Sequence, residues 1–310
     1  MENHYTVLAG GTGAARFLRG LAAILPPAEL QVIVNVGDDT EMWGLHISPD
    51  VDTILYALSG RLDTERGWGL RNETFRCLEA IRSLEMPAWF QLGDADLATH
   101  LTRTELLRSG LTLGEVTERL ASLFGVQATV LPATNDRVRT KIDTPGGLIP
   151  FQEFFVRDRW QPEVRNVIYS GAAEARAPKS VIASIREAKA VFIAPSNPIT
   201  SIGPILAVPE IREALRCTRA DIIAISPIIG TAAVSGPAGK LMEACGYAVS
   251  PAGVVRCYHD FLDDVIIHET DDALAASIRY DTLGVHVTDI LMPDIENARR
   301  LAEFALGVNK

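Results

Sequence analysis

The chain has 310 residues, of which 47% are hydrophobic and 22% charged, and its formal net charge at pH 7 is −10. This length suits one large α/β domain, or an α/β core with a smaller addition. The negative charge argues against a nucleic-acid partner, because non-specific binding of DNA or RNA needs a basic surface. No apolar run reaches the roughly 18 residues of a transmembrane helix, so no membrane partner is expected either.

Two further features concern the compartment. The N-terminus lacks the basic start and apolar stretch of a signal peptide. The four cysteines form no C-x-x-C pair and suit neither a zinc site nor a disulfide framework: Cys77, Cys217, Cys245 and Cys257. We therefore expect reduced thiols and a cytoplasmic location.

A βαβ unit opens the chain. Residues 5–9 are mostly apolar and are followed by glycines, which predicts a buried strand that enters a tight turn. Residues 14–25 carry apolar side chains at helical spacing until two prolines stop the pattern. Residues 30–36 are nearly all apolar, as expected for a strand of a parallel sheet covered on both faces. This opening predicts a doubly wound (Rossmann-like) fold, which binds ligands at the carboxyl ends of its strands.

The rest of the chain keeps this α/β rhythm with one interruption. Helical patterns cover 53–59, 72–84, 96–108 and 112–124, with Gly110 and Gly125 as stops for the last two. Residues 127–169 alternate instead and contain a Thr-Pro-Gly-Gly turn, which predicts β-hairpins in a small insertion. Later strands are expected at 190–194, 222–226, 265–267 and 285–288, and later helices at 179–187, 209–216, 240–245, 272–280 and 294–306. The predicted organisation is a single α/β unit over residues 1–310, with a mostly parallel sheet, helices on both faces and a smaller β-rich insertion.

A glycine-rich turn, formed by Gly10, Gly11, Thr12 and Gly13, lies between the first strand and the first helix. Glycines there let backbone N–H groups approach an anion, and the helix N-terminus adds a partial positive charge. The motif is not a dinucleotide fingerprint, because Arg16 stands where the third glycine would be, and no Walker A motif follows. It indicates either an anion-binding turn or simply a tight turn.

Four aspartates crowd into the region after the second strand: Asp38, Asp39, Asp50 and Asp52. Carboxylates placed close together raise each other's pKa unless a cation lies among them. Hard oxygen ligands of this kind suit Mg²⁺, which usually keeps several waters and shares its shell with substrate phosphates. The alternative is that Asp50 or Asp52 only caps the helix expected from residue 53. We predict a metal- or substrate-binding site, within which one of these two also caps that helix.

A later turn leads into the helix predicted at 96–108. Asp94 is in position to cap this helix, on which His100 and Arg103 are close enough to face one ligand. The simpler interpretation of His100 is a solvated or buried histidine without a catalytic role.

A rigid polar loop follows the strand predicted at 190–194. Ser196 and Asn197 lie between two prolines, which fix the backbone and leave the side chains free for a substrate. The simpler interpretation is a turn in which Thr200 or Ser201 caps a following helix. Farther along, Lys240 is able to reach a phosphate, although an exposed lysine is the commoner outcome.

No nucleophile signature is present. The sequence has no G-x-S-x-G motif, and Cys257 lies two residues from His259 without a third orienting group. Catalysis by metal, positioning and charge neutralisation is therefore favoured over a covalent enzyme intermediate.

These motifs, in this order, closely resemble one family, the 2-phospho-L-lactate transferases, called CofD or, in actinobacteria, FbiA. The resemblance covers nearly the whole chain, and the motifs are specific in combination. It rests on Gly10-Gly11-Thr12-Gly13 with Arg16-Phe17-Leu18, Asn35 to Asp39, Ser48 to Thr53, Gly67-Trp68-Gly69, Leu92-Gly93-Asp94, Asp96 to His100, Phe151-Gln152-Glu153, Ser196 to Pro204 and Ser226 to Ile229.

The resemblance implies an enzyme of coenzyme F(420) biosynthesis. In this family a guanosine diphosphate-activated 2-phospholactate, or its phosphoenolpyruvate counterpart, donates its phospholactyl or enolpyruvyl phosphate group. The acceptor is the ribityl hydroxyl of the deazaflavin Fo, GMP leaves, and a phosphodiester remains. Mg²⁺ is required, and family members look like homodimers. Such a transfer needs negative charge neutralised and the hydroxyl held in line, which agrees with the motifs above.

The resemblance gives the acids separate roles. We expect Asp39 and Asp50 to hold the metal, with Asp38 as a possible substitute, and Asp52 to contact Fo. Asp52 and His100 are the two candidates for the group that removes the acceptor proton, although a hydroxyl poised by the metal needs neither.

Other residues are assigned to the substrates. Gln91 matches another Fo contact of the family, at which some members carry lysine. Gly10 to Gly13, Ser196 and Asn197 are expected to bind the guanosine nucleotide and its phosphates. No residue decides whether the donor carries phospholactate, phosphoenolpyruvate or phosphoglycerate.

Two other interpretations stay open. A regulatory family linked to growth on gluconeogenic carbon sources shares the Gly-Gly-Thr-Gly turn and the Asp-Asp pair, and it binds sugar nucleotides. The segments 48–53 and 92–94 favour the transferases instead. A more remote possibility is an NAD(P)-dependent oxidoreductase with Asp38 on the ribose, but the missing third glycine and the surplus of carboxylates weigh against it.

Overall fold

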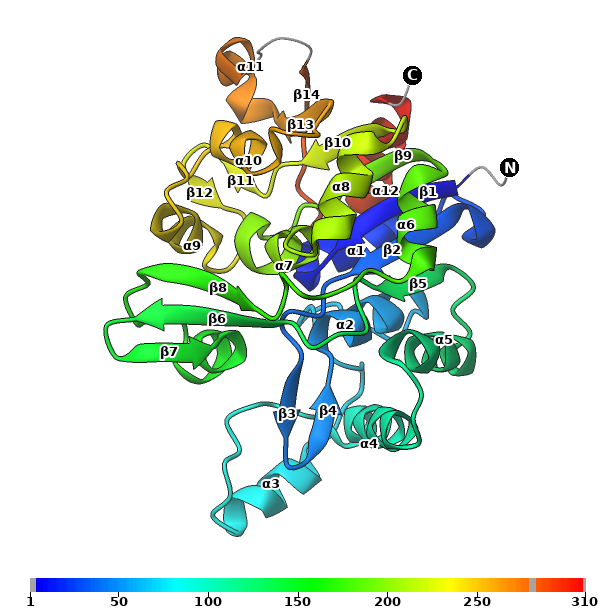
Figure 1. The fold of residues 1–310 in the computed structure, drawn as a ribbon, viewed down its shortest axis with the longest axis vertical. Coiled ribbons are helices and arrows are strands. Elements are labelled where there is room, and N and C mark those ends of the chain that lie inside the picture. The colour runs from blue at the N-terminus through cyan, green and yellow to red at the C-terminus, as the bar shows by residue number, and fades with distance from the viewer. Residues whose placement is uncertain (1–3, 279–282, 309–310) are drawn as a thin grey trace.

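The computed structural model describes residues 4–278 and 283–308, and its centre is a seven-stranded sheet (Figure 1). The strand order is β14-β13-β10-β9-β1-β2-β5, and all neighbouring strands in it pair parallel. The strands are β1 (His4–Ala9), β2 (Leu30–Val34), β5 (Thr129–Pro132), β9 (Ala188–Ile193), β10 (Asp221–Ile225), β13 (Asp264–His268) and β14 (Gly284–Thr288). The chain fills the sheet outward from β1 in one direction and then outward from β9 in the other. The boundary between β1 and β9 is therefore the topological switch point, and the predicted doubly wound fold is confirmed.

Helices cover both faces of this sheet, because successive side chains of a strand point to opposite sides. Val7 and Ala9 of β1 pack with one set of helices, whereas Leu8 packs with another. The first set is α1 (Gly11–Ala22), α2 (Pro49–Leu58), α5 (Leu113–Phe124) and α12 (Ile295–Val308). The second set is α6 (Lys179–Arg186), α7 (Gly203–Leu206), α8 (Pro209–Cys217), α9 (Ala238–Ala244) and α10 (Pro251–Tyr258). A smaller cluster joins α11 (Asp272–Ile278) to β13 and β14.

A separate three-stranded antiparallel sheet lies beside the main one (Figure 1). Its strands are β6 (Arg139–Thr144), β7 (Gly147–Pro150) and β8 (Asn166–Ser170), in the order β7-β6-β8. A short π-helical turn, Glu153–Arg157, connects β7 to β8. The predicted insertion of 127–169 is thus partly wrong, because its first strand, β5, pairs with β2 and forms the edge of the main sheet.

A third group of elements projects away from the sheet on the side of α2 (Figure 1). It contains β3 (Thr40–Met42), β4 (Leu45–Ile47), α3 (Arg76–Ser83) and α4 (Asp94–Arg108). Met42, Ile47 and Leu92 form its small core. The β3–β4 hairpin was not predicted, because its two-residue turn places Trp43 and Gly44 at φ 51° and 76°, and tryptophan is not a turn signal.

Helix ends follow local chemistry where the sequence carries it. Thr112 and Glu115 form a reciprocal capping box at the start of α5. Gly125 and Gly110 adopt left-handed conformations after α5 and α4, which confirms both as stops. The helix predicted at 272–280 corresponds to α11, and its last two residues lie outside the described ones.

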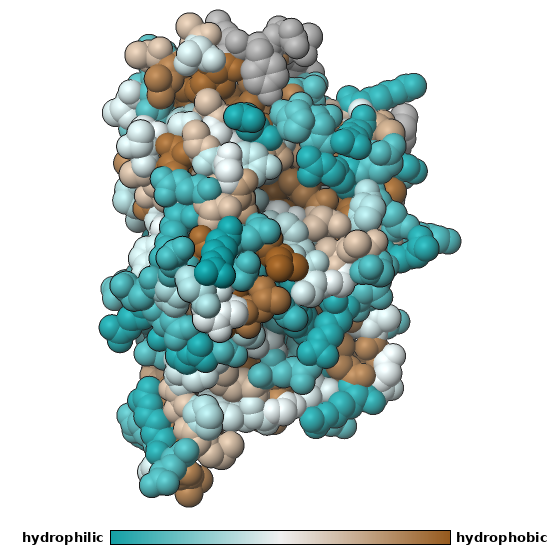
Figure 2. All heavy atoms as spheres, turned by 60° about the vertical axis from the view of Figure 1, so that its left-hand side comes forward, coloured by the Kyte–Doolittle hydropathy of each residue, from teal (hydrophilic) through white to brown (hydrophobic). Residues whose placement is uncertain are grey.

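Shorter elements complete the described chain. They are η1 (Pro27–Glu29), η3 (Pro198–Ile202), η4 (Glu269–Asp271) and the β11 (Ile228–Ile229) to β12 (Ala232–Ala233) hairpin. None of the described helices is long and apolar enough to cross a membrane. On the face that carries the small sheet, hydrophobic side chains lie in separate patches among hydrophilic ones (Figure 2). Large exposed apolar residues of the small sheet include Leu148 and Ile168. The predicted homodimer stays a prediction.

Candidate active site

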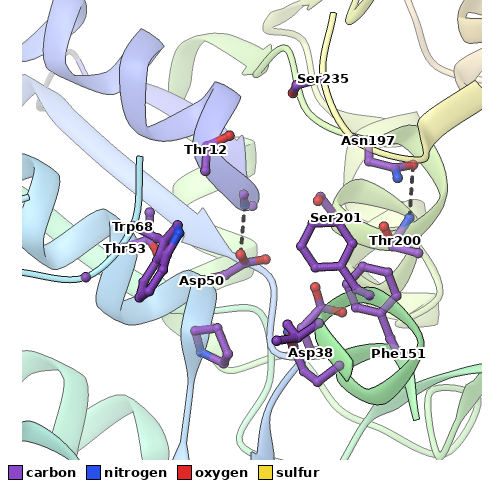
Figure 3. Close-up of a pocket in the computed structure, with 18 of the residues that line it drawn as sticks. Thr12, Asp38, Asp50, Thr53, Trp68, Phe151, Asn197, Thr200, Ser201 and Ser235 are labelled. Carbon is purple, nitrogen blue, oxygen red and sulfur yellow. Dashed lines mark hydrogen bonds between the residues drawn. The ribbon is translucent and has the colours of Figure 1, made fainter. Parts of the chain in front are cut away.

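A cavity of about 710 Å³ lies at the carboxyl ends of the parallel strands, around the switch point. The loops after β1, β2, β9 and β10 all reach it, so segments far apart in the chain share one wall. In Figure 3, one side of the cavity carries Thr12, Thr53 and Trp68 and the other carries Asn197, Ser201 and Phe151. The predicted edge of the sheet is therefore where the structure has its main cavity.

The glycine turn forms one wall. Gly10 precedes α1, which begins at Gly11, three residues earlier than predicted. A Cβ on Gly13 would lie 2.1 Å from the carbonyl oxygen of Pro195, so glycine is what lets α1 approach the loop after β9. The Gly11 N–H donates to Asp50 Oδ1 at 2.8 Å. The positive end of α1 thus already holds one carboxylate, and Thr12 and Gly13 face the cavity beside it.

The four clustered aspartates separate into different environments. Asp38, Asp50 and Asp52 line the cavity, whereas Asp39 is not among its lining residues. Asp39 Oδ2 accepts a hydrogen bond from the Ser48 hydroxyl and contacts His46 Nε2, both at 2.9 Å. Neither Asp50 nor Asp52 caps its own helix, so that interpretation was wrong, because α2 already begins at Pro49 and its N-cap makes no side-chain bond.

The pair of Asp38 and Asp50 fits a divalent cation. Burial and then the charge of Asp50 raise the pKa of Asp38 well above its usual range. Burial also raises the pKa of Asp50 to about 6, although Asn35 and Gly11 donate to its carboxylate. Asp38 Oδ1 is buried and has no hydrogen-bond partner among the described residues. Two crowded, desolvated carboxylates with a free oxygen are what Mg²⁺ would stabilise.

Asp39 is placed less directly for such an ion. Its Oδ1 is also buried without a hydrogen-bond partner in the described part of the chain, but His46 and Ser48 hold the other oxygen. Asp38 and Asp50 line the cavity and Asp39 does not, so Asp38 and Asp50 are the residues that would hold a metal at the cavity surface. The assignment of a metal to Asp39 stays a prediction.

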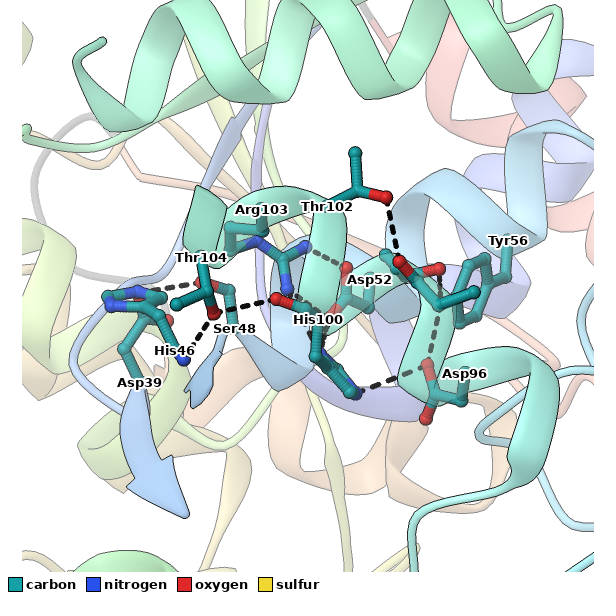
Figure 4. A network of polar contacts seen from close by, with 12 residues as sticks. Asp39, His46, Ser48, Asp52, Tyr56, Asp96, His100, Thr102, Arg103 and Thr104 are labelled. Atoms are coloured by element: carbon teal, nitrogen blue, oxygen red, sulfur yellow. Dashed lines mark hydrogen bonds and ion pairs between the residues drawn. The ribbon is translucent and has the colours of Figure 1, made fainter. Parts of the chain in front are cut away.

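Asp52 belongs to a buried polar network between α2 and α4 (Figure 4). The fully buried Arg103 donates to both carboxylate oxygens of Asp52, one of them at 3.0 Å. His100 Nδ1 lies 3.6 Å from Asp52 Oδ2 and 3.2 Å from Arg103 Nη1. Since a guanidinium only donates, Nδ1 accepts and the ring carries its proton on Nε2, which lies 3.4 Å from Asp96 Oδ1. The Tyr56 hydroxyl donates to the same Asp96 oxygen at 2.6 Å.

The prediction that His100 and Arg103 face one ligand was wrong. His100 lines the cavity, but Arg103 lies behind it and orients Asp52. Burial alone would lower the pKa of Arg103, yet contact with Asp52 raises it, so the guanidinium stays charged. The sequence interpretation also missed Tyr56 and Asp96. Their signal was present, since Asp52 and Tyr56, like Asp96 and His100, are four residues apart on one helix.

The loop after β9 uses its polar side chains partly for its own structure. The Ser196 hydroxyl donates to the Gly10 carbonyl at 2.7 Å and ties this loop to the glycine turn. Asn197 Oδ1 accepts from the N–H groups of Ile199 and Thr200, so Asn197 is the cap that was expected of Thr200 or Ser201. Both Ser196 and Asn197 line the cavity, and their contact with a substrate stays a prediction.

Two turns differ from their predicted use. Gly93, not Asp94, occupies the N-cap position of α4. The Asp94 carboxylate instead accepts from the N–H groups that begin α3, those of Arg76 and Cys77. In the same way, the Glu73 carboxylate accepts hydrogen bonds from the N–H groups that begin α4, those of Ala95 and Asp96. The exposed Gln91 lies between the two helices and lines the cavity.

Lys240 and Cys257 do not line the cavity. Lys240 donates to the backbone carbonyls of Trp160 and Gln161 and does not line the main cavity. Burial raises the pKa of Cys257 to about 12, and its thiol contacts the Gly253 carbonyl. All four cysteines are free thiols, as predicted, and none is placed as a nucleophile beside His259.

Fold and cavity together define a doubly wound α/β protein whose ligand site lies at the switch point and is lined by carboxylates. The sequence profile described as "2-phospho-L-lactate transferase CofD" matches residues 5–300. The chain therefore belongs to the CofD family of 2-phospho-L-lactate transferases, and the resemblance stated from the motifs is confirmed.

Relatives with two different names are about equally similar. The 2-phospho-L-lactate transferase of Methanosarcina acetivorans is 45% identical over 304 residues, which cover 97% of this chain and 98% of that protein. The phosphoenolpyruvate transferase of Nocardia farcinica is 44% identical over 296 residues, which cover 91% of this chain and 89% of that protein. Both names specify a transferase.

Among solved structures, a UPF0052 family protein from Bacillus halodurans has a similar fold. Its TM-score is 0.66 at 20% identity, and the match covers 98% of this chain and 100% of that one. At this identity the likeness concerns the fold alone.

Proposed function

We propose that this protein transfers a 2-phospholactyl or enolpyruvyl phosphate group from a guanosine diphosphate-activated donor to the hydroxyl of the deazaflavin Fo, in coenzyme F(420) biosynthesis. The hydroxyl oxygen forms a bond to the phosphorus that carries the organic acid. The bond from that phosphorus to the oxygen of GMP breaks, GMP leaves, and the hydroxyl proton passes to a base.

One observation carries the proposal. A single cavity joins the Asp38 and Asp50 pair, beside the N-terminus of α1, to the Asp52 and His100 network. Asp50 and Asp52 are two residues apart on α2, so a phosphate-and-metal end and an acceptor end lie next to each other. Phosphoryl-type transfer requires this proximity of a charge-neutralising site to a held hydroxyl.

The residues at the first end suit the donor. Mg²⁺ bound by Asp38 and Asp50 would neutralise the charge that develops on the diphosphate. Backbone groups of Thr12 and Gly13 at the start of α1 face the same space and favour an anion there. Asn197 lies across the cavity from Thr12 and offers its side-chain amide to the nucleotide (Figure 3). Ser196 lines the cavity next to Asn197, where its hydroxyl bonds the Gly10 carbonyl.

The residues at the second end suit the acceptor. Asp52 is held by Arg103 so that its carboxylate stays in one orientation beside His100. Trp68, Trp89 and Phe90 line the same cavity and offer aromatic surface to a flat deazaflavin ring. Gln91 lies next to these aromatic residues and is proposed to contact Fo.

The test is product formation with each donor. Purified protein is incubated with Fo, Mg²⁺ and the guanosine diphosphate derivative of phospholactate, phosphoenolpyruvate or phosphoglycerate, and Fo and GMP are followed by chromatography with mass detection. We expect a phosphodiester of Fo with one donor, lost without Mg²⁺ and in Asp50→Asn. Asp63→Asn, which removes the charge of a half-buried carboxylate that pairs with Arg66 outside the cavity, is the matched control. Nucleotide binding without product from any donor would overturn the proposal in favour of a non-catalytic binding protein.

Asp52→Asn and His100→Gln separate the two candidate bases. Replacing the residue that takes the proton should remove most of kcat. Binding of Fo, measured by Fo fluorescence, should be retained in that variant.

A further inference from the structure

Three arginines line the cavity without a partner of their own. The side chains of Arg16, Arg82 and Arg159 make no hydrogen bond or ion pair with any described residue. Arg157 also lines the cavity, but Glu153 and Asp158 already pair with it. Free guanidinium groups at the wall of a site for a multiply charged anion are groups available to that anion.

Arg159 differs from the other two in its backbone. Arg159 and the next residue, Trp160, both have positive φ values, 48° and 55°. Two successive non-glycine residues in the left-handed region are sterically unfavourable and persist only when the surrounding structure holds them. The π-helical turn just before them, Glu153–Arg157, is a second irregularity of the kind that often accompanies a functional site.

Several contacts hold this strained turn. Lys240 Nζ donates to the Trp160 carbonyl at 2.8 Å and to the Gln161 carbonyl at 3.2 Å. The Trp160 N–H donates to the Phe154 carbonyl at 2.8 Å. The Lys240 ammonium also lies 5.9 Å from the centre of the Phe154 ring. Lys240 therefore acts on the backbone that carries Arg159 and not on the cavity itself.

We propose that Arg159 is an anion-binding residue for the activated donor, and that Lys240 is its positioning residue. The proposal rests on the proposed function, because it assigns a subsite within that same cavity. The planar guanidinium matches either a phosphate or a carboxylate through two parallel hydrogen bonds. The donor carries both groups, whereas Fo has neither, so Arg159 serves the donor alone.

The first experiment compares ligands by titration calorimetry. GDP probes the phosphates, the activated donor adds the carboxylate, and Fo is the ligand that should not respond. We expect Arg159→Ala to weaken donor binding about tenfold or more, with Fo binding unchanged. An equal loss for GDP and donor assigns the phosphate, and a loss confined to the donor assigns the carboxylate. Arg165→Ala is the matched control, because Arg165 is exposed on the same connection, has no side-chain partner among the described residues and does not line the cavity.

The second experiment tests the positioning role. Lys240→Met should raise KM for the donor in the same direction as Arg159→Ala and by a smaller factor, while kcat changes little. The double variant Arg159→Ala/Lys240→Met should be no weaker than Arg159→Ala alone, because the lysine acts through the arginine. A purely structural role for Lys240 would instead lower the melting temperature and add its effect to that of Arg159→Ala.

The outcomes distinguish this inference from the proposed function. The inference is refuted, and the proposed function stands, if Arg159→Ala binds both GDP and the donor as tightly as the unaltered protein does. If the unaltered protein binds neither GDP nor any donor, the proposed function fails and takes this inference with it.

Discussion

Replacing Gly13 by alanine tests whether the close approach of α1 to the loop after β9 forms the site. The new Cβ would lie 2.1 Å from the Pro195 carbonyl oxygen, and real Cβ contacts essentially never fall below 3.0 Å. The helix start and the loop must therefore separate by about 0.9 Å, the difference between these two distances. This movement also carries the Gly11 N–H away from Asp50.

Two magnitudes follow for Gly13→Ala. Forcing extra volume into a packed contact costs about 1–3 kcal/mol of folding free energy. A misplacement of about 1 Å in a positioning wall costs on the order of 100-fold in rate. We expect kcat/KM of the transfer reaction to fall by about that factor.

Gly20 supplies the matched control within the same helix. A Cβ on Gly20 would lie 2.2 Å from the Ala298 carbonyl oxygen, where α1 packs on α12 and away from the cavity. Gly20→Ala should lose similar stability in urea denaturation, but its kcat/KM should stay within about threefold of the unaltered protein. The reasoning is refuted if both variants lose similar stability and Gly13→Ala keeps its kcat/KM.

Three further predictions concern single side chains. Arg103→Met should lower the free energy of unfolding by about 3–5 kcal/mol, because it leaves Asp52 buried without a partner. Adding Asp52→Asn should recover part of this loss, and denaturation of both variants checks it. The pKa of Asp50 is about 6 in the folded state against a usual 3.8. The protonated Asp50 therefore stabilises the metal-free protein below pH 4 by at most ~3 kcal/mol, and this contribution is lost as the pH rises through 6. Mg²⁺ should therefore raise the melting temperature more at pH 8 than at pH 5, and an equal rise in Asp50→Asn would contradict this. Asp94→Ala should cost about 1–2 kcal/mol, because it removes the bonds that begin α3, and hydrogen exchange should increase in α3 but not in α5.

Local patterns were sufficient at the start and the end of α5, where each residue acts on its own neighbourhood. Thr112 and Glu115 cap the helix that they begin, and Gly125 ends it, because each requires only a few residues of adjacent backbone. Near-continuous apolar runs likewise predicted most strands of the parallel sheet, since both faces of those strands are buried.

The failures at Asp94, Arg103 and β5 share one physical cause, which is a partner distant in the sequence. Asp94 stands where a local cap is expected, but packing of α3 against α4 brings a different helix start to its carboxylate. Arg103 sits on the same helix as His100, and an arginine is rarely fully buried, so nothing local indicated its pairing with Asp52. The strand β5 was assigned to the insertion because a short strand carries no mark of the sheet it joins.

The sequence alone determined the class of fold, the family and the edge of the sheet at which the candidate site lies, because the alternation of strands and helices and the glycine turn follow from local patterns. It also predicted Asp38, Asp50, Asp52, His100 and Ser196 as site residues, and the structure brings all of them to one cavity. Only the tertiary structure decided which of these residues are free to meet a ligand. Asp39 is held by His46 and Ser48, and Lys240 by two backbone carbonyls, whereas the Arg159 side chain has no hydrogen-bond or ion-pair partner among the described residues. Whether a polar group is satisfied depends on atoms that the fold brings from elsewhere in the chain, and no local pattern contains them.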